Sequence, residues 1–380
     1  MGPLEGVRVV ELASGAPCAF AATLLADLGA DVVRIDRPGA AAFGAADPLS
    51  RSRRSVAVDL KSPDGKRRVR DLIGRADVLL EGLRPGAAER LGIGPDSFAD
   101  SHPGLIYARV SGWGQSGPWA QRPGHDISFL AMAGLLDSDT APSGGPTPPS
   151  TYLSTFAGGG MLQALGVLAA LYERSRGGRG QVVDAAMVDG AALLEVMVRQ
   201  WRDNPGNVTV TDAPFYTTYA CQDGRSVAVG AIEPRFYEVL LTQLGLDGGD
   251  LPDRDDRTLW PALRDRIGEA FRARPRDYWV KAFVEHDACV VPVLDPDEAA
   301  EHPALRDRTT FVEVAGRPQP APAPRFSRTP ASAPTAAPCP GGSPDLVAST
   351  RAAREAGAIT LAVTNNPDSP LAAVSEYHLD

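Results

Sequence analysis

The chain has few of the residues that support metal, disulfide or nucleic-acid chemistry. Its 380 residues include four cysteines, which lie far apart without a C-x-x-C pair or a cluster of cysteine and histidine. This spacing argues against a zinc site and a disulfide framework, so we expect no metal ligands. The formal net charge is −9 and no block of lysine and arginine interrupts it. A nucleic-acid-binding surface is therefore not expected.

Long apolar runs are also missing. The N-terminal residues Met1–Glu5 form neither a basic segment nor an apolar one. No segment reaches the ~18 consecutive apolar residues that a membrane span requires. We therefore expect a cytoplasmic protein without a membrane partner.

The regular alternation of strand-like and helix-like segments defines the first third of the chain. At 380 residues, the chain exceeds the ~250–300 residues that one hydrophobic core usually serves, so more than one domain is expected. Strands are predicted at 6–12, 30–36, 56–60, 77–81 and 105–110, and helices at 17–28, 64–75 and 86–92. This order is typical of an open, mostly parallel α/β sheet.

The remaining segments predict a smaller second domain and a tail. We expect a large α/β domain at 1–190, a linker helix at 191–215, a small α+β domain at 216–295, a return segment with a Pro-rich connector at 296–342, and a tail at 343–380. Asp223-Gly224 separates two strand-like runs and predicts a hairpin. Residues 317–342 are rich in proline and alanine and should resist a packed element. In the tail, a helix at 345–356 and a strand at 359–364 have no visible partners.

The glycines at 112–117 match the G-x-G-x-x-G pattern of dinucleotide-binding loops. Pro118 and Pro123 follow, however, where the phosphate-binding helix should begin. We therefore interpret this segment as a tight loop on the substrate side.

Arginines collect beside the predicted strand ends, at Arg51, Arg53, Arg54, Arg84 and Arg90. Loops at the strand ends of open α/β sheets bind ligands, and arginine forks suit phosphate groups. A solvated basic surface explains the same spacing equally well, so the residues alone leave both interpretations open.

His125 and Asp126 are the candidates for acid–base chemistry. They lie in a loop bracketed by glycine and proline. Histidine titrates near neutral pH, and an adjacent carboxylate can orient or charge it. By itself, such a pair is more often part of an ordinary surface loop.

Taken together, these segments resemble the alpha-methylacyl-CoA racemases of the family III CoA-transferase superfamily. The resemblance covers residues ~3–337 and is carried by segments 6–12, 28–38, 59–62, 111–118, 124–127, 180–190, 229–234 and 324–327. It implies the family III CoA-transferase fold and an interlocked homodimer. It also implies a CoA thioester as substrate, with no separate cofactor, held around Arg37, Leu60, Lys61, Arg84 and Arg90.

The resemblance also exposes a missing catalytic group. In these racemases a His and an Asp act on opposite faces of the alpha carbon; His125 matches the first, but Thr155 stands at the position of the second. The same region carries the aspartate nucleophile of the related CoA transferases. A threonine hydroxyl without a neighbouring base is a poor proton acceptor.

We therefore expect His125 to exchange the alpha proton, while donors near a helix starting around Gly158 stabilise the enolate oxygen. The reaction is expected to have diverged towards double-bond isomerisation, elimination or cyclisation in specialised metabolism. The alternatives are a true racemase that uses water or Glu233 as the second base, a non-catalytic ligand-binding homologue, and a CoA transferase. The acyl carrier could be CoA, the pantetheine arm of a carrier protein, or no thioester at all.

The tail carries a second resemblance. Residues ~345–380 are similar to an interior piece of a sugar-isomerase (SIS) domain, but the Ser/Thr-rich phosphate loops of that domain are absent. We expect the tail to be an appended packing element.

Overall fold

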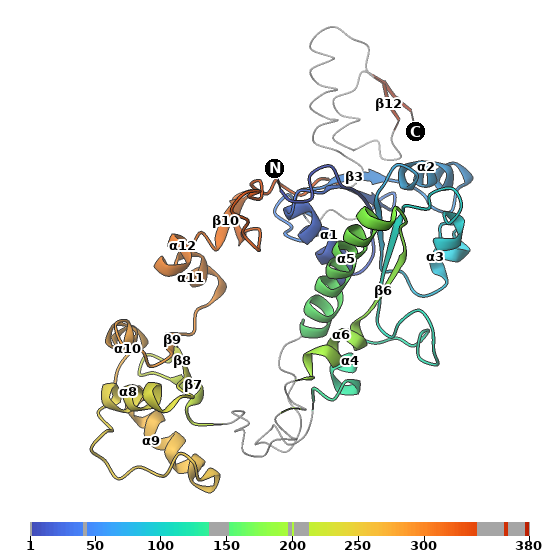
Figure 1. Cartoon of the computed structure of the whole chain (residues 1–380). Helices are drawn as coiled ribbons and strands as arrows, with labels where there is room; N and C mark the ends of the chain where they lie inside the picture. The colour runs from blue at the N-terminus through green and yellow to red at the C-terminus, as the bar shows by residue number, and fades with distance from the viewer. Residues whose placement is uncertain are drawn as a thin grey trace. The chain divides into compact units, whose positions relative to one another are not determined.

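The computed structural model describes residues 2–40, 44–136, 152–196, 200, 213–339, 361–363 and 377–379. These residues form two compact units (Figure 1). The large unit contains the described residues of Met1–Leu135, Pro148–Val196 and Arg308–Asp380, and the small unit those of Leu136–Thr147 and Met197–Asp307. The expected linker helix at 191–215 falls largely outside the described residues.

The large unit is built on a six-stranded parallel sheet. Its strands, in the spatial order β3-β2-β1-β4-β5-β6, are β1 (Arg8–Leu12), β2 (Asp31–Asp36), β3 (Arg54–Ala57), β4 (Val78–Glu81), β5 (Ile106–Ser111) and β6 (Val182–Ala186). Every neighbouring pair is parallel, which confirms the predicted α/β sheet. The strand order reverses between β1 and β4, and open sheets bind ligands outside the carboxyl ends of the strands at such a point.

Helices cover both faces of this sheet because alternate residues of each strand point to opposite sides. Val78 and Leu80 of β4 belong to one core cluster, with α1 (Ala16–Asp27) and α5 (Leu162–Gly177). Leu79 belongs to the other, with α2 (Pro63–Ile73) and α3 (Ala87–Arg90). Figure 1 shows α1 beside α5, and α2 and α3 away from them. Strands buried on both faces read as continuous apolar runs, and this made them predictable.

Two of the loop arginines are buried structural residues, which neither interpretation of the sequence anticipated. Arg51 lies 2.5 Å from Asp27, and Arg53 lies 2.6 Å from Glu11. Both side chains of the second pair are 0% exposed. Arg54 pairs with Asp31 at the surface. Because buried carboxylates already pair with Arg51 and Arg53, these two guanidinium groups are not available as phosphate forks.

The small unit packs helices on a three-stranded antiparallel sheet. Its elements are β7 (Tyr216–Ala220), β8 (Ser226–Gly230), β9 (Val290–Pro292), α8 (Pro234–Leu244), α9 (Trp260–Arg272) and α10 (Arg276–Phe283). β7 and β8 pair as a hairpin, with Gly224 at φ +75° in the turn. The hairpin predicted from Asp223-Gly224 is therefore confirmed.

The segment after the small unit returns to the large unit and contains an unpredicted strand pair. Past α11 (Pro296–Glu301) and α12 (Pro303–Asp307), β10 (Phe311–Val314) pairs with β11 (Arg317–Pro320). The expectation of no packed element from residue 317 onward was wrong, because Ala315 and Gly316, at φ +50° and +75°, close a tight turn that suits a hairpin. The segment is anchored where Arg51 donates to the Pro320 carbonyl oxygen at 2.7 Å.

In the tail, β12 (Leu361–Val363) pairs in parallel with β13 (Tyr377–Leu379). The predicted strand at 359–364 therefore has a partner, which the sequence did not reveal. The predicted helix at 345–356 lies outside the described residues.

One helical segment contradicts the prediction that no part of the chain is long and apolar enough to span a membrane. Leu153–Gly177 passes that test by length and composition. Its residues Val167 and Ala170 are buried in the core with α1 and the sheet. This packing is that of a core helix, whose apolar residues cover a sheet face.

A pH-dependent ion pair supports the small unit. Arg276 donates to both carboxylate oxygens of Glu298, at 2.9 and 2.8 Å, and these hydrogen bonds hold the pKa of Glu298 down to about 2. An acidic group whose pKa is lowered in the folded state stabilises the fold fully at pH values above its ordinary pKa, and this stabilisation is lost as the pH falls through the lowered pKa.

We predict that Glu298→Gln lowers the Tm above pH 5, and that the difference in Tm between this variant and wild type shrinks towards zero near pH 2. Glu301→Gln, at an exposed pair with Arg306, is the control; a Glu298→Gln difference independent of pH would contradict this account.

Candidate active site

His125 lies at the carboxyl edge of the sheet, immediately before α4 (Asp126–Met132). Phe129 fixes the loop that presents it. A Cβ on Gly112 would stand 2.6 Å, and one on Gly124 2.7 Å, from the Phe129 ring, so both positions require glycine. The His125 side chain is exposed within the single chain. The imidazole therefore stands at the surface of the large unit, while its loop is held by Phe129.

Aromatic residues support the 112–124 loop from within. Trp113 packs edge-to-face on Phe129 and on Trp119, with ring centroids 4.8 and 4.9 Å apart. Gln121 Nε2 donates to the Pro85 carbonyl oxygen at 3.1 Å. The loop therefore joins the His125 region to the segment that carries Arg84. As predicted from Pro118 and Pro123, no phosphate-binding helix begins in this loop.

Asp126 holds Thr155 in place beside His125. Its Oδ1 accepts hydrogen bonds from the Thr155 backbone N–H at 2.7 Å and from the Ser154 hydroxyl at 2.8 Å. Its Oδ2 is buried and has no hydrogen-bond partner among the described residues. The structure thus brings His125, Asp126 and Thr155 together, and one Asp126 oxygen is committed to fixing the backbone at Thr155.

Ser154 is a site residue that the sequence reading missed. It is fully buried and donates to Asp126. The sequence offered only a small polar residue directly before Thr155. Its partner is 28 positions away in the chain, so spacing alone could not have revealed the contact.

The expected helix start near Gly158 was wrong. The helical segment begins earlier, as the nine-residue π-helix η3 (Leu153–Met161), and runs directly into α5. Gly158 lies inside η3 against α6 (Met187–Leu194), so close that a Cβ on Gly190 would meet the Gly158 carbonyl oxygen at 2.0 Å. Backbone N–H groups within a helix are bonded to preceding carbonyls. The Gly158 region therefore does not offer the free donors expected for an enolate oxygen.

A hollow of about 810 Å³ opens at the carboxyl ends of β1 to β4. Arg37, Leu60 and Lys61 line it. Arg84 and Arg90 are the exposed neighbours of two further lining residues, Leu83 and Leu91. Three of the five predicted residues therefore line this hollow, and Arg84 and Arg90 are not among its lining residues.

Two acidic residues, Asp36 and Asp59, also line this hollow. Asp36 accepts from Arg34 Nε at 2.9 Å and from the Ser55 hydroxyl at 2.6 Å, and Asp59 Oδ1 accepts from the Lys61 backbone N–H at 2.9 Å. Arg37 and Lys61 supply the positive charge of the lining, which suits an anionic ligand.

A buried charge network fixes the segment that carries Arg84. Glu81 accepts from the Leu83 backbone N–H at 2.6 Å and from Arg109 Nε at 2.6 Å. Arg109 also pairs with Glu89 of α3 at 2.7 Å. Burial raises the pKa of Glu81, whereas the hydrogen bond from Arg109 lowers the pKa of Glu89. This network could not be predicted from the sequence, and its contacts hold the connection between β4 and α3.

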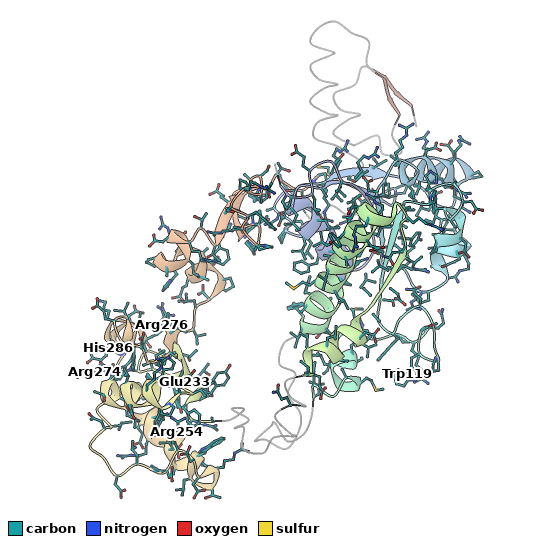
Figure 2. The ribbon with its side chains drawn as sticks, viewed as in Figure 1. Trp119, Glu233, Arg254, Arg274, Arg276 and His286 are labelled. Atoms are coloured by element: carbon teal, nitrogen blue, oxygen red, sulfur yellow. The ribbon has the colours of Figure 1, made fainter. Side chains whose placement is uncertain are left out.

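Glu233 lies in the small unit, labelled in Figure 2, as the N-cap residue of α8. Its side chain is exposed. His125, Asp126 and Thr155 belong to the large unit, so the four candidate catalytic residues are divided between the two units.

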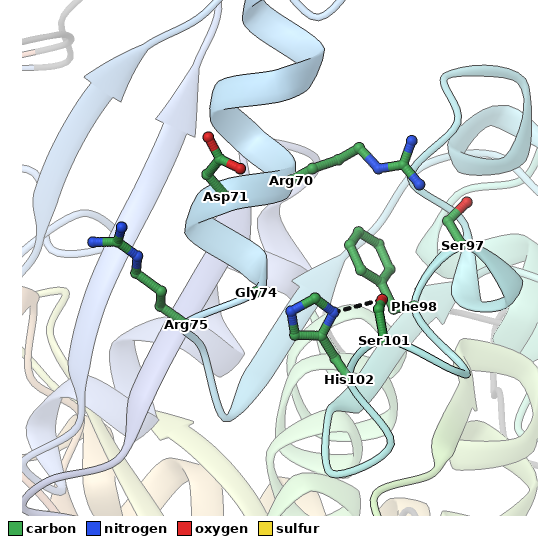
Figure 3. Close-up of a pocket in the computed structure, with 8 residues that line it drawn as sticks. All are labelled: Arg70, Asp71, Gly74, Arg75, Ser97, Phe98, Ser101 and His102. Carbon is green, nitrogen blue, oxygen red and sulfur yellow. Dashed lines mark hydrogen bonds between the residues drawn. The ribbon is translucent and has the colours of Figure 1, made fainter.

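A second hollow, of about 300 Å³, lies at the amino edge of the sheet (Figure 3). Arg70, Arg75 and His102 line it near the end of α2, with the His102 ring fixed by the Ser101 hydroxyl at 2.8 Å. Cations near a helix C-terminus are stabilised by the helix dipole, which disfavours an anion there. We therefore assign this hollow no ligand. Among the described residues, no group of three His, Cys, Asp or Glu side chains could hold a metal ion.

Comparisons with known proteins agree with the fold. The family model of CoA-transferase family III matches residues 4–343. The alpha-methylacyl-CoA racemase of Mus musculus is 44% identical over 336 residues, covering 86% of this chain and 87% of the relative. The alpha-methylacyl-CoA racemase of Homo sapiens is 42% identical over 336 residues, and the alignment again covers 86% of this chain and 87% of the relative. The crystal structure of Rv3272 from M. tuberculosis superposes with a TM-score of 0.74 at 27% identity, covering 90% of this chain and 97% of that one.

Proposed function

The chain belongs to CoA-transferase family III, and from this we propose a racemase-like acyl-CoA enzyme in which His125 transfers the proton next to the thioester carbonyl. The observation that carries the proposal is the joint position of His125, Asp126 and Thr155. The imidazole stands at the surface of the large unit, and Asp126 fixes the backbone of Thr155 beside it. Proton transfer by a positioned histidine contributes ~10²–10⁴-fold to rate.

The position of Thr155 supports a diverged reaction. A hydroxyl stands where a two-base racemase would need a carboxylate, and Asp126 Oδ1 is occupied by two donors. Reactions that need a base on one face then become favoured: a double-bond shift, an elimination or a cyclisation. Racemisation with water or Glu233 as the second base is the second candidate, and the 44% identity to a racemase favours it.

The hollow lined by Arg37, Leu60 and Lys61 supports a CoA thioester as the substrate. The guanidinium group of Arg37 and the ammonium group of Lys61, beside open strand ends, suit phosphate groups. We propose that Arg84 and Arg90 extend this site. No further cofactor is proposed.

We also propose a cytoplasmic homodimer. Large apolar side chains are exposed along η3, α5 and α6, among them Met161, Leu165, Tyr172, Leu193 and Val196. Apolar surface of this kind marks contact sites between proteins. A second copy of the chain is the occupant we propose for it.

The test of the proposed function is solvent deuterium incorporation at the alpha carbon of a 2-methylacyl-CoA, followed by mass spectrometry, together with CoA binding by calorimetry. We expect both binding and enzyme-dependent exchange. Binding without any exchange would instead indicate a ligand-binding homologue. Hydroxylamine trapping during turnover tests the CoA-transferase alternative: we expect no trapped acyl-enzyme, because Thr155 has no carboxylate that could form an anhydride.

A further inference from the structure

We propose that Gln319 is a positioning residue for the hollow that Arg37 lines: acting through the 44–52 loop, it fixes the wall on which CoA binds. The inference rests on the proposed function, because that function places CoA in this hollow. It also makes ligand binding and the docking of the return segment depend on each other. Every contact that carries the inference lies within the large unit.

Gln319 is a polar residue buried on the strand β11, with 3% of its surface exposed. Both ends of its amide are bonded: Oε1 accepts from Arg51 Nη1 at 3.2 Å, and Nε2 donates to the Ala46 carbonyl oxygen at 2.9 Å. Arg51 is itself held by Asp27 at 2.5 Å. A buried polar group with all its partners in place specifies one geometry. β11 therefore holds the 44–52 loop in a fixed position.

The segment that follows β11 holds the same loop at two further points. Ala337 N–H donates to the Ala45 carbonyl oxygen at 2.9 Å. Ser52 N–H donates to the Thr335 carbonyl oxygen at 3.1 Å, and Thr335 N–H donates back to Ser52 Oγ at 3.1 Å. Ser52 has φ +59°, which residues other than glycine rarely adopt. The surrounding contacts must therefore maintain this conformation.

Hydrogen bonds lead from the 44–52 loop to the wall of the hollow. Asp47 accepts from the Ser50 hydroxyl at 2.5 Å, and Ser50 Oγ accepts from Arg34 Nη1 at 3.2 Å. Arg34 Nε donates to Asp36 at 2.9 Å. Asp36 and the next residue, Arg37, both line the hollow. A displacement of the loop is therefore transmitted to the wall.

The residues at the far end of this network do not contact the ligand site. Gln319 and Ser50 are not among the lining residues of the hollow, so they act on a ligand only through Asp36 and Arg37. Energetic coupling between two sites is reciprocal. A ligand that binds the wall should therefore also stabilise the docked return segment.

The first test is hydrogen exchange followed by mass spectrometry on the full chain, with and without CoA. In wild type, CoA should slow the exchange of amides at 34–37 and also at 44–52 and 335–337. In Gln319→Met, the protection by CoA should weaken at 44–52 and 335–337. Protection confined to the hollow in wild type would overturn the coupling.

The second test measures the Kd of CoA by calorimetry and the kinetics of deuterium wash-in with a 2-methylacyl-CoA. Gln319→Met should raise the Kd by ~2–10-fold, the worth of one hydrogen bond. KM should rise by the same factor with kcat unchanged, as expected for the loss of uniform binding. A general loss of structure would lower kcat as well. Glu313→Gln, an exposed change on the neighbouring strand β10, is the control.

Two further variants keep the test decisive if Gln319→Met does not fold. Gln319→Glu keeps the acceptor for Arg51 but loses the donor to Ala46, so it should also raise the Kd. Ser50→Ala interrupts the network closer to the hollow and should raise the Kd too. Combined with Gln319→Glu, its effect should be smaller than the product of the two single effects, because both changes act through one network.

The outcomes separate the inference from the proposed function. If wild type does not bind CoA, or if Arg37→Gln leaves the Kd unchanged, the assignment of CoA to this hollow fails and the inference falls with it. If Arg37→Gln weakens binding while the Gln319 and Ser50 variants bind CoA like wild type, the positioning role fails and the proposed function stands.

Discussion

Replacing His125 with alanine is expected to lower the rate of alpha-proton exchange by ~10²–10⁴-fold, the contribution of one general acid–base group. The residue is exposed, and the loop around it is held by Phe129, Gly112 and Gly124. The substitution should therefore leave the fold intact. CoA affinity should also be unchanged, because the hollow proposed to bind CoA is lined by other residues.

The measurement is deuterium wash-in at saturating 2-methylacyl-CoA, with calorimetry for binding and circular dichroism for the fold. His102→Ala is the control, since His102 lies in the hollow at the amino edge of the sheet (Figure 3). Exchange by His125→Ala within a few-fold of wild type would mean that another group removes the proton.

Replacing Arg53 with methionine is expected to destabilise the large unit by ~3–5 kcal/mol, the cost of removing one partner of a buried ion pair. Arg53 donates to Glu11 at 2.6 Å, to the Ala19 carbonyl oxygen at 2.5 Å, and to the Thr23 hydroxyl. Without it, Arg34 at 3.9 Å is the one ion-pair partner left to Glu11 among the residues that the structure describes. A carboxylate with no exposed surface is then left with one distant counter-charge.

The free energy of unfolding in urea measures this effect. Arg54→Met is the matched control: Arg54 pairs with Asp31 at the surface, and exposed pairs contribute ~0–1 kcal/mol. Equal destabilisation by the two substitutions would contradict the buried-pair account.

The strands of the sheet could be predicted because each one is marked by the apolar pattern of its own few residues. Each strand buried on both faces reads as a short apolar run, and Leu79 or Val10 enters a core cluster whatever its partner strand is. The hairpin at Asp223-Gly224 is local in the same way. The strand at 317–320 was missed because its prolines suggested a connector, whereas the turn at Ala315-Gly316 decided the pairing.

The site residues could be named, but most of their contacts could not. Arg53 and Glu11 are 42 positions apart, and Thr155 and Asp126 are 29 apart. Such pairings depend on the order of the strands, which spacing does not encode. The helix start at Leu153 rather than Gly158 was also missed, because glycine at 158 serves close packing against Gly190 and not a helix terminus.

The stereochemical course of exchange tests the central claim most directly. Each enantiomer of a 2-methylacyl-CoA is incubated in D2O with wild type and with Thr155→Asp, and both deuterium content and configuration are followed. With one base, wild type should exchange with retention, and Thr155→Asp should gain inversion by orders of magnitude. Rapid inversion by wild type, unchanged in Thr155→Asp, would show that a second base acts despite Thr155 and would contradict the one-base account.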